Sequence, residues 1–374
     1  MKYRRISILY DGSLYTFKWL KALLWARDTF KEAGIEIDFV NTLQYLPFKF
    51  NRSSLSGSIA RKHFDILLVA HHHSHLYGLG GLSKDSLLDV LGRLRNQSDL
   101  LVWLDTADST GTTKFDVLPH VDLYLKKQVL KSKERYLYPI WGGRPFCEYY
   151  HLKYGIEDPD ISEDTYTAAQ RGDLHKIQLS WNVGLADLFN SSKYATYARP
   201  HLFTLPRFTE AAEIRTFDLQ YRGSAWSSAA GWQRTRAREL VSMRHDLSYP
   251  AVDTKVPYTE YIAEVQKSRS VVSPFGWGEI CGRDFEAFAY GATLLKPDMS
   301  HLETFPQWYR PYETYIPIDW DFSNFDDVLD AIRPRSADYL RIAQNGQDLY
   351  RSFLEGRPAK KLFVEHVLAT LGLS

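Results

Sequence analysis

The sequence predicts an α/β protein with two domains, each built on a parallel β-sheet covered by helices. Short apolar runs alternate with amphipathic stretches between residues 5 and 126, and a second series of this kind begins at residue 217. Such alternation is typical of right-handed βαβ units, which form parallel sheets. The chain has 374 residues, more than twice the usual size of one domain. We therefore expect one sheet in each half of the chain.

In the first series, strands are expected at 5–10, 35–40, 65–70, 99–104 and 121–126. Helices are expected at 15–33, which Gly34 closes, and at 83–95, where leucines recur at helical spacing. Residues 142–175 are rich in acidic residues and tyrosine, and we expect them to be irregular. A strand at 176–180 and a short helix at 184–190 are expected to follow.

Residues 191–208 contain Pro200 and Pro206 and show weak periodicity, so we expect them to link the domains. The second series predicts strands at 217–221, 270–274 and 292–296, and helices at 232–243, 258–268, 283–290, 339–354 and 362–371. The expected division is an N-terminal domain at 1–200, a C-terminal domain at 201–335 and terminal helices at 336–374.

Composition argues against several classes of function. Lysine and arginine total 46 against 45 acidic residues, so no global field draws the protein to nucleic acid or to an anionic bilayer. Cys147 and Cys281 lie far apart and form neither a metal-ligand spacing nor a disulfide framework, which favours a reducing compartment. No signal-peptide core is apparent, and the longest apolar runs are strand-sized. We expect a soluble, cytoplasmic protein without a transmembrane segment.

The most informative segment runs from a strand through a glycine-rich loop directly into a helix. Gly276, Gly278 and Gly282 permit close approach of the backbone to a ligand, and a helix N-terminus favours a diphosphate. Arg283, in the first helical turn, adds a cation with fork geometry for phosphate oxygens. Glu286, one turn further, is suited to accept hydrogen bonds from a ribose diol. The alternative is an ordinary loop followed by an Arg283–Glu286 pair on a helix surface.

This segment resembles the C-terminal domain of GT-B glycosyltransferases, in particular CgeB-like enzymes and those similar to families 1 and 4. The matching pattern is formed by Arg283, Glu286, Ala287, Ala289, Gly291 and Ala292. The resemblance covers about residues 217–335. It implies that Glu286 contacts the nucleotide ribose, and that Arg283 and the loop amides hold the diphosphate.

The resemblance also implies an architecture and a reaction. Two Rossmann-like domains would face each other across a cleft, with the nucleotide-sugar donor on the C-terminal domain and the last helix crossing back to the N-terminal domain. The sugar would pass from a nucleotide-diphosphate sugar to a glycan, a lipid-linked acceptor or a small molecule. No cofactor, metal or nucleic acid is expected, and peripheral contact with a membrane stays open.

The sequence departs from the family pattern at one position. Retaining enzymes of the family-4 type have a second glutamate eight residues before the ribose glutamate, and Gly278 occupies that position here. Glu279 is adjacent but out of register, and we keep it as a candidate contact to the donor. The stereochemistry of transfer therefore stays open.

A second group of candidate donor contacts follows the strand at 217–221. Arg222, Gly223 and Ser224 form a basic turn that the fold would point at the donor phosphates, the alternative being a plain turn. Arg222 and Arg283 would then stabilise the leaving diphosphate in place of a metal. Arg234 and Arg238 lie one helical turn apart, and one of them is a further candidate for a phosphate contact.

Three stretches of the N-terminal half are expected at the cleft, because they follow strands. Asp11 is a candidate catalytic base, with Gly12 and Ser13 on the acceptor side, unless this stretch is a surface turn. His72 is a second candidate base and His73 an acceptor contact. Adjacent histidines on a strand alternate sides and cannot all face one ion, so no metal is expected.

The third stretch begins at Asp105, a further candidate on the acceptor side. Asp105 and Asp108 do not have the spacing of the metal-binding Asp-x-Asp motif. Two other functions stay open: a nucleotide-sugar epimerase with the same fold, and a non-catalytic nucleotide-binding α/β module. A dehydrogenase is disfavoured, because no Gly-x-Gly-x-x-Gly follows the first strand.

Overall fold

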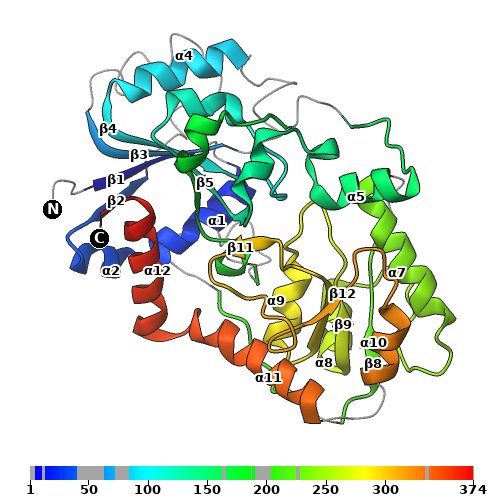
Figure 1. Cartoon of the computed structure of the whole chain (residues 1–374). Coiled ribbons are helices and arrows are strands. Elements are labelled where there is room, and N and C mark those ends of the chain that lie inside the picture. The colour runs from blue at the N-terminus through cyan, green and yellow to red at the C-terminus, as the bar shows by residue number, and fades with distance from the viewer. Residues whose placement is uncertain are drawn as a thin grey trace.

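The structure is a computed structural model. It describes residues 5–10, 13–39, 63–71, 84–161, 166–186, 188–189, 204–212, 214–224, 228–332 and 337–373. A six-stranded and a four-stranded sheet form the centres of two domains, and every strand pair within these sheets is parallel (Figure 1). The predicted α/β class with two Rossmann-like domains is confirmed.

The N-terminal sheet has the order β2-β1-β3-β4-β5-β7. Its strands are β1 (Arg5–Tyr10), β2 (Glu36–Phe39), β3 (Phe64–His71), β4 (Ser98–Asp105), β5 (Leu123–Lys126) and β7 (Ile177–Leu179). Helices α1 (Leu14–Trp25), α2 (Arg27–Glu32) and α12 (Gly356–Thr370) lie on one side, and α4 (Lys84–Arg95) lies on the other (Figure 1). The strand order reverses between β1 and β3, and in such sheets ligands bind beyond the carboxyl ends at the reversal.

The C-terminal sheet has the order β12-β10-β9-β8. Its strands are β8 (Phe217–Gln220), β9 (Ser268–Val272), β10 (Thr293–Pro297) and β12 (Ile316–Ile318). One face packs on α7 (Trp232–Met243) and α10 (Phe325–Ile332), and the other on α8 (Tyr258–Gln266), α9 (Gly282–Ala289) and α11 (Ala337–Ser352) (Figure 1).

The core is continuous between the two domains. A large apolar cluster runs from the N-terminal sheet through α9, α11 and α12, and a smaller one fills the face of the second sheet under α7 and α10. Phe285 of α9 lies with its ring 5.3 Å from that of Tyr350 on α11. Gly184 makes this packing possible, since a Cβ there would lie 2.4 Å from the Phe285 ring. The domains are therefore joined by packed side chains as well as by the chain.

The N-terminal half departs from prediction in three places. The helix expected at 15–33 is two helices, because Ala26 leaves helical geometry (φ −96°, ψ 9°). The stretch 142–175, expected to be irregular, contains α5 (Pro145–Tyr154), which starts at a proline and ends at Gly155 with φ 63°. The helix expected at 184–190 is a single 3-10 turn, η7 (Val183–Leu185). Further 3-10 turns are η2 (Phe115–His120), η3 (Lys133–Leu137), η4 (Trp141–Gly143), η6 (Arg171–Lys176) and η8 (Ala229–Gly231).

A two-stranded antiparallel pair, absent from the prediction, joins the domains. It consists of β6 (Gln128–Leu130) and β11 (Leu302–Thr304). Each strand has three residues, which is too short to show an alternating pattern in the sequence. The pairing is also hidden in the sequence, because the two strands belong to different domains.

Helix α12 leaves the C-terminal domain and packs beside α2 (Figure 1). Its Phe363 ring lies 5.3 Å from Trp181 and 6.2 Å from Phe30, both in the core of the N-terminal domain. His366 shares a 2.9 Å hydrogen bond with the carbonyl of Ser180. The last helix thus completes the hydrophobic core of the first domain.

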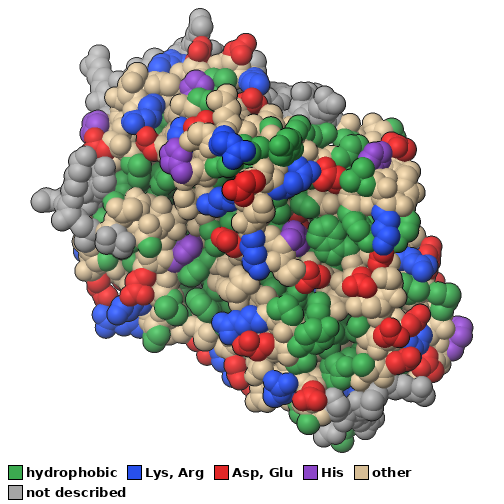
Figure 2. Space-filling view, in the orientation of Figure 1, with side chains coloured by type: hydrophobic (Ala, Val, Ile, Leu, Met, Phe, Trp, Pro, Cys, Tyr) green, Lys and Arg blue, Asp and Glu red, His purple; other side chains and the backbone are tan. Residues whose placement is uncertain are grey.

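The surface carries charges of both signs. Lysine, arginine and acidic side chains are interspersed over the face shown in Figure 2, in keeping with the formal net charge of +1. Among the helices of the described ranges, none combines the length with the apolar composition that crossing a bilayer requires.

Candidate active site

A pocket of about 670 Å³ lies at the carboxyl edge of the C-terminal sheet. Its walls are the turn after β8, the segment 252–256, one side of α7 and the first turns of α9. It brings together six of the residues that the sequence predicted for the donor: Arg222, Gly223, Ser224, Gly282, Arg283 and Glu286. Ligands of open α/β sheets bind at this edge.

A buried ion pair beneath the pocket fixes the start of α9. Lys296 Nζ lies 3.0 Å from Asp284 Oδ2, and both side chains are fully buried. Asp284 also accepts hydrogen bonds from the Cys281 amide (3.0 Å), the Ser273 hydroxyl (2.6 Å) and the Tyr309 hydroxyl (2.7 Å). The carboxylate therefore ties together the strand end, the loop and the first turn of the helix.

Arg283 lines this pocket and has two nitrogens without a hydrogen-bond partner in the described ranges. Its Nη2 donates to the carbonyl of Arg222 at 2.5 Å, whereas Nε and Nη1 are buried and have no hydrogen-bond partner among the described residues. The alternative of a surface Arg283–Glu286 pair predicts an ion pair, and the described part of the chain contains none between these two residues. Buried donors are nearly always satisfied, so two guanidinium nitrogens without a partner are suited to an anionic acceptor such as phosphate.

Glu286 lies three residues further on α9 and is held from α8. Its Oε1 accepts a 3.0 Å hydrogen bond from Tyr258, and its Oε2 a 2.7 Å bond from Tyr261. Burial, reinforced by the Glu286 charge, raises the pKa of Tyr261 well above its ordinary value. The hydroxyl therefore remains a donor at physiological pH.

The Arg222 side chain does not supply the free cation expected of it. Its guanidinium makes two 2.6 Å bonds to Glu264 and also binds Thr254. These contacts neutralise the charge and fix the segment 252–256. What Arg222 offers to the site is its carbonyl, which orients Arg283. Gly223 is required here because a Cβ would lie 2.3 Å from the Tyr221 hydroxyl.

Other cations line the pocket in its place. Arg234 donates through Nε to the carbonyl of Phe275 at 2.9 Å and packs on Gly276, where a Cβ would lie 2.9 Å from Arg234 Nη2. Arg238 lines the pocket and makes no hydrogen bond or ion pair within the ranges that the structure describes. With Arg283, it is the candidate phosphate contact best supported by geometry.

Two loop residues predicted for the donor lie in the contact between the domains. Glu279 is fully buried and accepts hydrogen bonds from Ser109 Oγ (3.0 Å) and Thr110 Oγ1 (2.7 Å). At Gly278 a Cβ would lie 1.8 Å from the carbonyl oxygen of Asp108. Neither residue lines the pocket, so the pocket gives no support to their expected role as donor contacts.

The acceptor-side candidates are only partly described. Asp11, Gly12, His72 and His73 lie outside the described residues. Ser13 caps α1, its Oγ accepting from the amide of Thr16 at 3.2 Å.

The Asp105 carboxylate makes a buried ion pair and a buried hydrogen bond. It pairs with Lys126 at 2.5 Å, and both side chains are almost fully buried. It also accepts a 2.9 Å hydrogen bond from the hydroxyl of Tyr124. Asp105 thus holds the ends of β4 and β5 together, and the expected contact of this residue with an acceptor stays a prediction.

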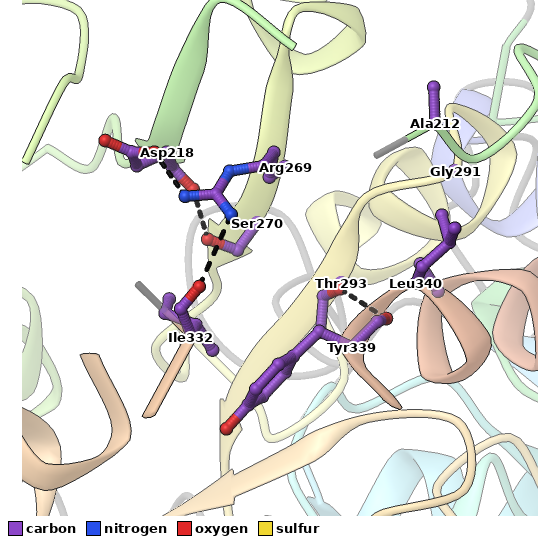
Figure 3. A pocket seen from close by; sticks show the side chains of 10 residues that line it. Ala212, Asp218, Arg269, Ser270, Gly291, Thr293, Ile332, Tyr339 and Leu340 are labelled. Atoms are coloured by element: carbon purple, nitrogen blue, oxygen red, sulfur yellow. Dashed lines mark hydrogen bonds and ion pairs between the residues drawn. The ribbon is translucent and has the colours of Figure 1, made fainter. Parts of the chain in front are cut away.

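A second cavity lies at the opposite edge of the C-terminal sheet (Figure 3). Arg269 pairs there with Asp218, whose carbonyl accepts a hydrogen bond from the Ser270 hydroxyl, and Thr293 binds the carbonyl of Tyr339. Its volume of about 30 Å³ is that of a single water molecule. It therefore has no room for a nucleotide.

Among the residues that the structure describes, no three histidine, cysteine or acidic side chains gather in a group that could hold a metal ion.

Comparison with known proteins gives structural neighbours only. No protein-family model matches the chain, and no curated protein matches its sequence. Among solved structures, the Anabaena protein HepE in complex with UDP-glucose is similar at 8% identity and a TM-score of 0.43, over 98% of this chain and 99% of that one. The S. aureus protein MnaA with UDP is 12% identical with a TM-score of 0.40, over 100% and 98%. An α-glucosyltransferase bound to UDP and a 13-mer DNA is 10% identical with a TM-score of 0.45, over 99% and 100%. At these values the likeness assigns no role to any residue, and the chemistry of the pocket rests on the contacts above.

Proposed function

We propose that the protein is a metal-independent, cytoplasmic glycosyltransferase of the GT-B type, which transfers a sugar from a nucleotide-diphosphate sugar to an acceptor. One observation carries the proposal: Arg283, in the first turn of α9, lines the pocket, and its buried Nε and Nη1 have no hydrogen-bond partner among the described residues. A helix N-terminus and a guanidinium with two unpaired nitrogens together favour a diphosphate. Glu286 stands one turn away as an acceptor for ribose hydroxyls.

In the proposed reaction the bond between the anomeric carbon and the diphosphate oxygen breaks, and an acceptor hydroxyl oxygen forms the new bond. Charge develops on the departing diphosphate, where Arg283, Arg238 and the amides at the start of α9 stabilise it. The acceptor hydroxyl loses its proton to a base on the N-terminal domain, for which Asp11 and His72 stay the candidates. We propose a glycan, a lipid-linked molecule or a small molecule as the acceptor.

The first experiment is a thermal-shift screen of nucleoside diphosphates and nucleotide sugars. A ligand that binds only the folded protein raises the melting temperature in proportion to the logarithm of its concentration over Kd. Product analysis with the best donor then separates three outcomes: a transferred sugar supports the proposal, an epimerised donor identifies an epimerase, and binding without turnover identifies a non-catalytic module.

Glu286→Ala is expected to weaken nucleotide binding about tenfold to a hundredfold without unfolding the protein. The reason is the loss of hydrogen bonds to a charged acceptor, each worth about 1.5–3 kcal/mol. Calorimetric titration with the best nucleotide of the screen measures the change. Glu365→Ala on α12, an exposed glutamate paired with Lys361, is the matched control and should bind normally. Unchanged affinity in folded Glu286→Ala protein would remove Glu286 from the site.

Activity is expected to survive exhaustive treatment with EDTA. In the proposed site Arg283 and Arg238, both lining the pocket, supply the positive charge that other enzymes obtain from a divalent ion. The measurement is the initial rate of transfer before and after chelation, with added magnesium or manganese as the control. Loss of turnover that either ion restores would contradict metal independence.

A further inference from the structure

Both oxygens of the Glu286 carboxylate accept hydrogen bonds from side chains of another helix. Tyr258 and Tyr261 are three residues apart on α8, so their side chains leave the same side of that helix. One hydroxyl reaches Oε1 at 3.0 Å and the other reaches Oε2 at 2.7 Å. The rings lie 6.0 Å apart at 36°. The two hydroxyls therefore fix the plane of the carboxylate.

These two hydrogen bonds leave some acceptor positions of the Glu286 carboxylate unoccupied. An ionised carboxylate has about four acceptor positions, and the tyrosines occupy one on each oxygen. Because the orientation of the carboxylate is fixed, the directions of its two remaining acceptor positions are fixed as well. Glu286 lines the pocket. Two neighbouring hydroxyls of a ligand match such a pair of acceptors.

Burial explains the bond from Tyr261 but not the one from Tyr258. Tyr261 is half-buried, and a hydroxyl withdrawn from water needs a partner. Tyr258 is 51% exposed, and water would satisfy its hydroxyl without Glu286. A second bond that burial does not require indicates that the orientation of the carboxylate is itself important.

We propose that Tyr258 and Tyr261 are positioning residues that aim Glu286 at the 2′- and 3′-hydroxyls of a ribose, so that the pocket selects ribonucleoside over 2′-deoxyribonucleoside diphosphates. This inference rests on the proposed function, because it needs a nucleotide in the pocket. The competing role is a purely structural tie between α8 and α9. The two roles differ in one respect: only positioning makes the effect of a tyrosine depend on the hydroxyls of the ligand.

The test compares UDP with 2′-deoxyuridine diphosphate by calorimetric titration, or the matching pair for whichever base the thermal-shift screen selects. The wild-type protein should bind the ribonucleotide about tenfold or more tightly than the deoxynucleotide, since a hydrogen bond to a charged acceptor is lost. Tyr261→Phe should weaken the ribonucleotide about tenfold and the deoxynucleotide less than about threefold. Tyr258→Phe should show the same pattern with a smaller loss, because its hydroxyl is replaced by water.

Two controls keep the result interpretable. Tyr138→Phe removes the hydroxyl of another exposed tyrosine, in the N-terminal domain, and should change neither affinity. Adding Tyr261→Phe to Glu286→Gln should cost little further affinity, since the positioned group is already altered.

The outcomes separate the two proposals. Equal losses for both nucleotides in a variant that melts normally would overturn the positioning role and leave the glycosyltransferase proposal standing. Failure of every nucleoside diphosphate to bind the wild-type protein would overturn the proposed function itself.

Discussion

Replacing Arg283 with lysine is expected to lower kcat about a hundredfold to a thousandfold and to raise the donor KM much less. Lysine keeps the charge but loses the planar fork, and two nitrogens of the Arg283 fork, Nε and Nη1, have no hydrogen-bond partner among the described residues. A donor that acts on charge developing in the transition state is worth about 2.7–4 kcal/mol. Steady-state kinetics of the purified variant, with its melting temperature as a folding check, measures the effect.

Arg236→Lys is the matched control for this variant. Arg236 is an arginine of the neighbouring helix α7, half exposed and paired with Glu239 at 3.6 Å. Exposed pairs of this kind contribute under about 1 kcal/mol to stability. The kcat of the Arg236→Lys variant is expected to equal that of the wild-type protein. If Arg283→Lys also melts normally and turns over at the wild-type rate, Arg283 has no part in the reaction.

Lys296→Met is expected to lower the free energy of unfolding by about 3–5 kcal/mol, because removing one partner of a buried ion pair leaves the other charge uncompensated. Lys296 and Asp284 are both fully buried, with Nζ 3.0 Å from the carboxylate. Asp284 also holds the Cys281 amide at the start of α9. The variant is therefore expected to bind nucleotide more weakly as well, under conditions in which it stays folded.

Denaturant titration of Lys296→Met against Lys361→Met separates this effect from a general loss of charge. Lys361 lies on the surface of α12, 3.7 Å from Glu365, with its side chain 71% exposed. Its replacement should change stability by less than about 1 kcal/mol. Similar unfolding midpoints for both variants would show that the buried pair contributes little.

The regular elements could be predicted from sequence where strands and helices alternate, as from β1 to β5 and from β8 to β10. The pairing of β6 with β11 could not, since each strand has only three residues and its partner lies in the other domain. Helix α5 carried local signals that were overlooked, namely Pro145 at its start and Gly155 at its end. None of its buried residues is aliphatic, so the helical spacing of its apolar side chains was not recognised.

The same difference between local signals and contacts of distant segments applies to the candidate site. That Arg283 and Glu286 line one pocket could be predicted, because helix start, charge and spacing are local properties. The hydrogen bonds of Tyr258 and Tyr261 to Glu286 could not be predicted, because they form only when α8 packs beside α9.

Asp105 was assigned to the acceptor side although the parallel register places it opposite Lys126. A carboxylate and an amine at the ends of neighbouring parallel strands are a signal that sequence reasoning can use once the strand order is known. The partners of Glu279 and Gly278 belong to the other domain, and no local pattern indicated them.

The return of α12 to the first domain also bears on how the protein is made. A ribosome releases the chain from the N-terminus onward, and domains generally fold as they emerge. Here the rings of Trp181 and Phe30 meet Phe363, which is synthesised after the whole C-terminal sheet. The N-terminal domain is therefore synthesised before the C-terminal sheet but completes its core only with α12. A chain that ends before residue 356 would lack the helix that completes this core.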